Sequence, residues 1–354
     1  MRHSVWSLLV ATPFLAQIGL ASQLPEGCDY EKECVVELVG SRCGDGSPSY
    51  FSFFPKRDSQ DLVVFLESGG ACWSKDTCKA GHVTRLSRKP SRKFALKEKG
   101  LLDLENPLFP LHGSHLVTIP YCTGDVFLGD TETNYGSENK PNLIHHRGYR
   151  NVILTLEAVS SLFPNLKRVV LLGRSAGGLG VHGHVRSLDH YFPQSQKFAI
   201  ADAGTPFMPP YLREDAYLKI MKAWNAFGTL PPLSKPGGIN HFGEVLKFNQ
   251  MQFPHIRFGL IQAYEDSVMT YFAKSVGAPV PSEAVRRSMI EASNTYLGLE
   301  TPHAKVFFLN GKSHVQTKKD LAKLVSEETS LLEWLNGMFH NGEWENVRPD
   351  LHSQ

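Results

Sequence analysis

Short apolar runs recur along the chain, and each ends at glycine or polar residues. The clearest run, Val169–Leu172, is partly β-branched, as is typical of a buried parallel strand. The sequence Gly-Arg-Ser-Ala-Gly follows over residues 173–177, and after it apolar residues recur at the spacing of a helix. The pattern therefore predicts a strand, a sharp turn at Ser175 and a helix, which is the context of a nucleophile elbow.

Further runs of the same kind predict the rest of a sheet. The candidate strands are Tyr50–Phe54, Leu62–Leu66, Ser114–Ile119, Lys197–Ala201, Ile256–Ala263 and Lys305–Leu309. Strands that alternate with helical patterns indicate an α/β fold with a doubly wound, mostly parallel sheet. A last helical pattern predicts a helix that covers one face of this sheet. Its apolar positions are Leu321, Leu324, Leu331, Leu332, Leu335 and Met338.

Two stretches differ in composition from their surroundings. Thr205–Asn240 is dense in proline and aromatic residues, which favours an inserted, lid-like region, with a surface excursion as the alternative. Residues 81–114 are rich in Lys and Arg. For this second stretch we favour a solvated helical face over a rim that attracts an anionic polymer.

Length and charge exclude several classes of protein. The 354 residues are 42% hydrophobic, which is enough for a large core and argues against disorder. The 37 basic and 35 acidic residues leave a net charge of +2, so no overall field points to nucleic acid or to a membrane. No repeat or clear linker divides the chain, and we expect one catalytic domain over residues 22–354.

The first 21 residues have the pattern of an export signal. A weakly basic start precedes the mostly apolar Val5–Leu20, and Gly19–Ala21 offers a small-x-small cleavage site. A membrane anchor is the alternative, but the apolar part is shorter than the ~20 residues that span a bilayer, and Pro13 interrupts it. We therefore expect a secreted protein, extracellular or periplasmic, without stable membrane insertion.

Six cysteines fit an oxidising compartment. They are Cys28, Cys34, Cys43, Cys72, Cys78 and Cys122. A zinc site is the competing interpretation, but no paired C-x-x-C spacing supports it. Disulfides leave ~15 connectivities open. We favour Cys72–Cys78 as a local link, Cys43–Cys122 across strands and Cys28–Cys34 near the terminus. We expect no metal and no cofactor.

Three residues that follow apolar runs suggest the chemistry. Ser175, Asp266 and His314 occur in the chain order of an α/β-hydrolase triad. Parallel strands bring such residues together beyond their carboxyl ends. His314 would take the serine proton, and Asp266 would orient the imidazole. The pattern predicts a serine nucleophile that forms an acyl-enzyme.

Each partner of the serine has a rival. Asp202 also ends a predicted strand, but Asp266 comes one strand before the histidine, where a triad acid is expected. Asp202 would then brace the loop beside the elbow. His303 precedes the final strand and should lie at the opposite edge of the sheet, so His314 is preferred.

The glycine loop after Leu62–Leu66 is a candidate for the oxyanion hole. Gly69 and Gly70 would present backbone N–H groups without side-chain obstruction, together with the N–H of Ala176. A plain tight turn is the alternative for this loop.

Five motifs carry a resemblance to a known family. They lie at residues 43–48 (CGDGSP), 65–73 (FLESGGACW), 121–125 (YCTGD), 173–178 (GRSAGG) and 202–204 (DAG). In this order they resemble the pectin acetylesterase family, which includes the secreted Notum carboxylesterases. The resemblance implies an α/β-hydrolase fold and carboxylic ester hydrolysis. It implies a triad of Ser175, Asp266 and His314, and an oxyanion hole at Gly69, Gly70 and Ala176.

Two positions depart from the family pattern. Arg174 stands where a small residue is expected, and the loop Gly-Gly-Ala-Cys-Trp is closer to bacterial-type members than to the plant form Gly-Gly-Trp-Cys. Plant members deacetylate pectin, whereas Notum removes a fatty acyl group from a protein serine. The substrate of this chain therefore does not follow directly from the plant members or from Notum.

Two classes of function remain after these observations. The first is a secreted serine carboxylesterase acting on O-acetyl or other short acyl esters, on a polysaccharide such as pectin, with a Notum-like deacylase of longer chains as its variant. The second is a non-catalytic carbohydrate- or lipid-binding protein on a hydrolase scaffold. The complete Ser, Asp and His set favours the esterase, and nothing in the sequence indicates a peptide-binding cleft. The oligomeric state stays open.

Overall fold

The computed structural model describes residues 24–79, 84–90, 98–207, 213–230, 242–278, 281–296, 301–340 and 342–349. The predicted export signal, residues 1–21, lies outside the described residues, as do parts of the proline-rich stretch. Among the described residues, no helix combines the length and apolar character needed to cross a membrane.

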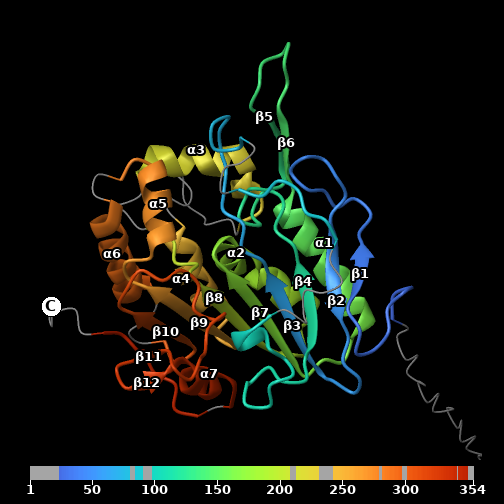
Figure 1. Ribbon diagram of the computed structural model, residues 1–354, viewed down its shortest axis with the longest axis vertical. Coiled ribbons are helices and arrows are strands. Elements are labelled where there is room, and N and C mark those ends of the chain that lie inside the picture. The colour runs from blue at the N-terminus through green and yellow to red at the C-terminus, as the bar shows by residue number, and fades with distance from the viewer. Residues whose placement is uncertain are drawn as a thin grey trace, which may run out of the picture.

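An eight-stranded sheet forms the centre of the fold (Figure 1), in the order β1-β2-β4-β3-β7-β8-β9-β10. The strands are β1 (Cys34–Glu37), β2 (Tyr50–Phe54), β3 (Asp61–Leu66), β4 (His115–Ile119), β7 (Arg168–Arg174), β8 (Gln196–Asp202), β9 (Ile256–Ala263) and β10 (Ala304–Leu309). From β4 to β10 neighbouring strands are parallel, while β1 and β2 are antiparallel. The predicted doubly wound α/β fold is confirmed, and every predicted strand is present.

Helices cover both faces of this sheet. They are α1 (Gly148–Leu162), α2 (Ala176–Tyr191), α3 (Glu214–Trp224), α4 (Gly243–Gln252), α5 (Ser267–Ser275), α6 (Pro281–Glu291) and α7 (Leu331–His340). Side chains of α1, α2 and α4 belong to the core on one face, and those of α7 to the core on the other. The short elements are η2 (Gly100–Leu102), η3 (Ala226–Gly228) and η4 (Ala292–Tyr296).

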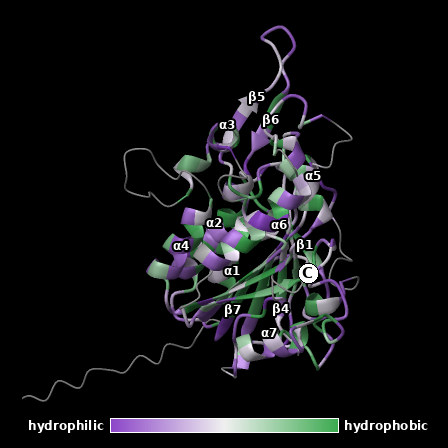
Figure 2. Ribbon diagram, turned by 90° about the vertical axis from the view of Figure 1, so that its left-hand side faces the viewer, coloured by the Kyte–Doolittle hydropathy of each residue, from purple (hydrophilic) through white to green (hydrophobic). Residues whose placement is uncertain are grey.

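Alternation along the strands explains the two cores. In β7, Val169 and Leu171 point into the core with α1 and α2, while Val170 and Leu172 point into the core with α7. Successive side chains of a strand lie on opposite faces, so a strand covered on both sides becomes a continuous apolar run. In Figure 2 hydrophobic residues, in green, run through the sheet, and hydrophilic residues, in purple, lie toward the surface.

Two hairpins lie outside the main sheet. One is formed by β5 (Thr131–Asn134) and β6 (Leu143–His146), and it projects from the body of the molecule (Figure 1). The other, β11 (Val325–Ser326) and β12 (Thr329–Ser330), precedes α7. The sequence patterns predicted neither hairpin, because each is short and only partly apolar.

The prediction of the C-terminal helix was wrong about where the helix begins. α7 covers a face of the sheet as expected, but it begins at Leu331 rather than near Leu321. The carboxylate of Glu333 accepts from the N–H of Ser330 (2.8 Å), and Ser330 Oγ accepts from the N–H of Glu333 (3.2 Å). This reciprocal capping box fixes the first turn of the helix.

The prediction of a helical face over residues 81–114 was also wrong for the described part. Residues 84–90 are irregular, and residues 98–114 contain turns, irregular backbone and η2. Arg88 forms an ion pair with the buried Glu67 (2.7 Å), and the N–H of Arg85 donates to the carbonyl of Gly69 (3.1 Å). Contacts with the glycine loop, rather than helical hydrogen bonds within the segment, therefore fix the position of residues 84–90.

Three disulfides join all six cysteines: Cys28–Cys34, Cys43–Cys122 and Cys72–Cys78. These are the pairs favoured from the sequence. His146 lies beside the sulfur atoms of Cys72–Cys78. Its Nδ1 is 2.8 Å from the carbonyl of Thr123, and its Nε2 is 2.9 Å from Tyr135 Oη. Both ring nitrogens are thus engaged with protein groups.

Buried histidines make the stability of the fold dependent on pH. Burial lowers the pKa values of His146, His182 and His184 to about 4 each. These pKa values lie below the value of about 6.5 that a histidine has in an unfolded chain. The contribution of the three histidines to the free energy of unfolding is therefore present above pH 6.5 and is lost as pH falls toward 4. Each group accounts for about 3 kcal/mol. Burial raises the pKa of Asp125 to about 6, which offsets part of this loss in the same range.

We expect the free energy of unfolding in urea to fall by several kcal/mol between pH 6.5 and pH 4. The variant His184→Gln should flatten this dependence, and the exposed His340→Gln should not. A free energy of unfolding that stays constant over this range would contradict the prediction.

Candidate active site

Ser175 lies in a strained turn between β7 and α2. Its backbone has φ 56° and ψ −116°, a conformation rare for residues other than glycine and common at functional sites. The turn needs glycine beside it, because a Cβ at Gly177 would lie 2.1 Å from the carbonyl oxygen of Leu66. The strand-turn-helix context predicted from the sequence is present, with Ser175 only 8% exposed.

Asp266 and His314 form a close pair. Asp266 precedes α5, and its Oδ1 accepts from the N–H groups of Val268 (2.9 Å) and Met269 (3.0 Å). Its Oδ2 is 2.7 Å from His314 Nδ1 and also accepts from Gln262 Nε2 (3.2 Å). Asp266 is completely buried, whereas the side chain of His314 is 18% exposed. The carboxylate is thus fixed on all sides and orients the imidazole.

Asp202 connects the serine to the histidine-bearing loop. Its backbone carbonyl accepts from the N–H of Ser175 (2.8 Å), and its carboxylate accepts from the N–H groups of Gln316 and Thr317. Asp202 therefore braces the loop after His314, not only the elbow. No hydrogen bond joins Ser175 Oγ to His314 within the described residues.

His303, the rival of His314, lies elsewhere. His303 stands at the start of β10, where its Nε2 is 2.9 Å from the carbonyl of Gln250. This is the opposite end of the strand from the loop that carries His314.

Two residues beside Ser175 carry the backbone N–H groups that are candidates for the oxyanion hole. Gly70 and Ala176 both line the cavity next to Ser175, and Gly70 has φ 78°. No hydrogen bond of either N–H is found in the part of the chain that the structure describes. Ala176 is the first residue of α2, where free N–H groups and the helix dipole favour negative charge. Gly69 does not line the cavity.

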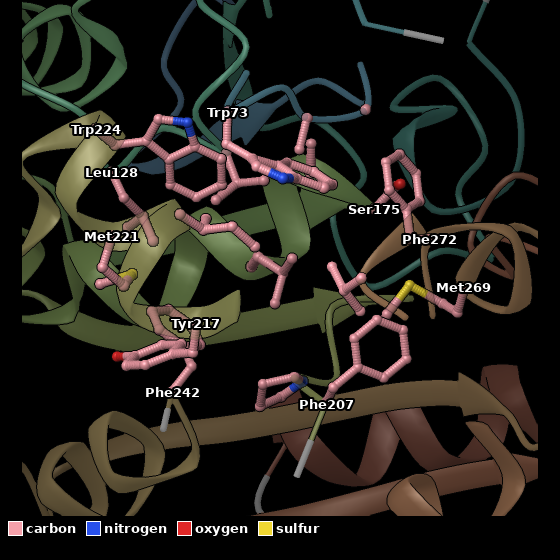
Figure 3. Close-up of a pocket in the computed structure, with 18 of the residues that line it drawn as sticks. Trp73, Leu128, Ser175, Phe207, Tyr217, Met221, Trp224, Phe242, Met269 and Phe272 are labelled. Carbon is pink, nitrogen blue, oxygen red and sulfur yellow. The ribbon is translucent and has the colours of Figure 1, made fainter. Parts of the chain in front are cut away.

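A deep apolar cavity opens at Ser175 (Figure 3), with about 860 Å³ of space including its mouth. Ser175 lies at one end, and Met221 and Trp224 of α3 lie at the other (Figure 3). Nearly all of the wall is hydrocarbon. The labelled wall residues are Trp73, Leu128, Phe207, Tyr217, Met221, Trp224, Phe242, Met269 and Phe272.

The sequence analysis missed several of these residues. It expected an inserted region over Thr205–Asn240, and the described part of that region supplies Phe207 and α3 to the cavity wall. It did not single out α5, which supplies Met269 and Phe272. Gln262 was also missed, although a lone amide inside the apolar run of β9 was a usable signal.

The comparisons with known proteins agree with this geometry. Residues 29–218 match the pectinacetylesterase family. The chain is 28% identical over 186 residues to palmitoleoyl-protein carboxylesterase notum1a of Danio rerio, covering 49% of this chain and 36% of that protein. It is 28% identical over 172 residues to pectin acetylesterase 4 of Arabidopsis thaliana, covering 47% and 41%.

One solved structure supports the fold over nearly the whole chain. The Wnt deacylase Notum from Drosophila matches with a TM-score of 0.64 and 19% identity, covering 90% of this chain and 96% of that one. In sequence, by contrast, the matches span well under half the length of the curated relatives. Because the family match covers more than half of the chain, the chain belongs to the pectinacetylesterase family, a family of carboxylic ester hydrolases.

Proposed function

We propose that this protein is a secreted serine carboxylesterase that removes a hydrocarbon acyl chain from an ester. Ser175 is the nucleophile, His314 the base and Asp266 the residue that orients the base. The close pair of Asp266 and His314 supports these roles, as does the strained turn at Ser175. Three disulfides support action in an oxidising compartment outside the cytosol.

The proposed reaction uses each of these groups in turn. Ser175 Oγ bonds to the ester carbonyl carbon while its proton passes to His314 Nε2. The carbonyl oxygen becomes an oxyanion, which the N–H groups of Gly70 and Ala176 bind. The carbon–oxygen bond to the alcohol then breaks, and the alcohol leaves with the proton from His314. Water repeats the sequence on the acyl-enzyme and releases the carboxylic acid.

The apolar cavity carries the proposal for the acyl group. The sequence led us to expect an acetyl or other short ester, but an acetyl group would leave most of this space unfilled. Each buried methylene contributes about 0.8 kcal/mol, roughly a fourfold gain in affinity. A chain of medium or long length uses the cavity far better than acetate does.

A series of p-nitrophenyl esters from acetate to palmitate tests this proposal. We expect kcat/KM to rise about 15-fold for each added pair of methylenes, up to the chain that reaches Met221. The variant Met221→Trp should move the optimum to shorter chains because the indole fills the far end of the cavity. Met251→Trp is the matched control, since Met251 is exposed on α4, and it should leave the optimum unchanged.

Activity that is highest on acetate and declines with each added methylene would contradict the acyl-chain proposal. It would favour the O-acetyl esterase expected from the sequence.

A further inference from the structure

Arg174, which departs from the family pattern, is buried directly behind the nucleophile. It is the last residue of β7, adjacent to Ser175, and it is 0% exposed. Its Nη1 forms an ion pair with Glu98 (2.5 Å), and its guanidinium lies over the ring of Phe65, 5.0 Å from the ring centre. Burial lowers the pKa of Arg174, and the carboxylates of Glu98 and Asp202 oppose that shift.

The same guanidinium holds the loop that carries His314. Arg174 Nε donates to Thr317 Oγ1 (2.8 Å), and Nη2 donates to the carbonyl of Thr317 (3.1 Å). Thr317 Oγ1 in turn donates to Asp202 Oδ2 (2.7 Å). Arg174 and Asp202 are also paired in register across β7 and β8. One hydroxyl thus links two buried, oppositely charged side chains.

Asp202 completes the attachment of this loop. Its carboxylate accepts the backbone N–H groups of Gln316 (2.9 Å) and Thr317 (2.7 Å), and it is fully buried. These bonds lie immediately after Val315, which has φ 60°. Positive φ is strained for a β-branched residue and persists only where the surroundings hold it. The strained residue directly follows His314.

We propose that Arg174, Thr317 and Asp202 form a clamp that positions His314 relative to Ser175. The proposal rests on the serine esterase function proposed above. Arg174 and Asp202 come from the two strand ends at the elbow, and Thr317 comes from the histidine loop. The clamp therefore fixes the two reacting side chains to the same point of the sheet, while Asp266 sets only the rotation of the imidazole. Arg174 and Thr317 are positioning residues and do not touch the substrate.

Paired variants of Thr317 test the clamp with little change in volume. Thr317→Val removes the bridging hydroxyl, and Thr317→Ser keeps it. We expect kcat on a p-nitrophenyl ester to fall about 10- to 100-fold in Thr317→Val, with KM changed little, because small misplacements of catalytic groups cost about this much. Thr317→Ser should restore kcat to within a few-fold of the original protein.

Thr155→Val is the matched control for stability. Thr155 is also fully buried, and its Oγ1 donates to the carbonyl of Asn151 (2.8 Å) in α1. This variant should lower the melting temperature to a similar extent while kcat stays unchanged. A role of Thr317 in stability alone predicts the same behaviour for both valine variants.

A proton resonance reads the position of His314 directly. The Nδ1–H of an imidazole bonded to a buried carboxylate gives a far-downfield signal, because such charge-assisted bonds are short. We expect this signal to be sharp in the original protein and in Thr317→Ser, and to be weakened or shifted in Thr317→Val.

A double-mutant cycle tests the part played by Arg174. Arg174→Lys keeps the charge but loses the planar fork that bonds Thr317 at two points. We expect this variant to lower kcat as Thr317→Val does, and the double variant to be no worse than either one, since the residues act as a unit.

The results separate the two proposals. If the original protein reacts with a fluorophosphonate and hydrolyses esters, the serine esterase function stands. Under that condition, equal kcat for Thr317→Val and Thr317→Ser would overturn the clamp. An original protein without serine reactivity would instead overturn the proposed function.

Discussion

Replacing Ser175 with alanine is expected to lower kcat for ester hydrolysis by at least about 10⁴-fold, because no other group can form the acyl-enzyme. The fold should be retained. Alanine is nearly the same size, and the N–H of residue 175 can still donate to the carbonyl of Asp202. Turnover of p-nitrophenyl esters gives the rate, and circular dichroism with a melting curve gives the folded state.

Covalent labelling supports the same assignment independently of turnover. A fluorophosphonate should add one label to the original protein and none to Ser175→Ala, as read by intact mass. Ser187→Ala is the matched control, because Ser187 is similarly buried on α2. Labelling or turnover that persists in Ser175→Ala would mean that another residue is the nucleophile.

Replacing Asp266 with asparagine is expected to lower kcat by about 10³- to 10⁴-fold. The remaining side-chain oxygen can still accept from Val268 and Met269, so α5 should keep its cap. The new amide cannot accept the Nδ1–H of His314 with the charge that stabilises the imidazolium. We therefore expect KM and the melting temperature to change little while kcat falls.

A second histidine–aspartate pair provides the control for Asp266. His255 Nε2 is 2.7 Å from Asp189 Oδ1, the same distance as in the pair of His314 and Asp266, but it lies at a solvent-exposed position away from the cavity. Asp189→Asn should leave kcat unchanged. A wild-type rate in Asp266→Asn would remove this residue from the mechanism and direct attention to Asp202.

The sequence predicted the central strands well because their signal is local. A parallel strand that is covered on both faces becomes a run of apolar residues, and it can be found without knowing its neighbours. β1 and the hairpin of β5 and β6 could not be found in this way. β5, for example, alternates between half-buried and exposed residues, and it exists because it pairs with β6.

The positions of the candidate site residues were predictable where chain order reflects fold topology. Ser175, Asp266 and His314 each follow a strand, so the parallel sheet alone brings them to one edge. The role of Arg174 could not be predicted, because it depends on Glu98 and Thr317, which are 76 and 143 residues away in sequence. The cavity wall was unpredictable for the same reason, since it combines separate loops and helices.

The far wall of the cavity and the proposed catalytic residues belong to different parts of the molecule. Ser175 and His314 follow strand ends, whereas Met221 and Trp224 lie on α3, which is fastened to the glycine loop by the bond from Trp224 Nε1 to the carbonyl of Cys72 (2.7 Å). Substitutions on α3 can therefore change which acyl chains the cavity accepts without moving the proposed catalytic residues. Exchange of this one helix between homologues offers a direct route to esterases with new preferences on an unchanged catalytic frame.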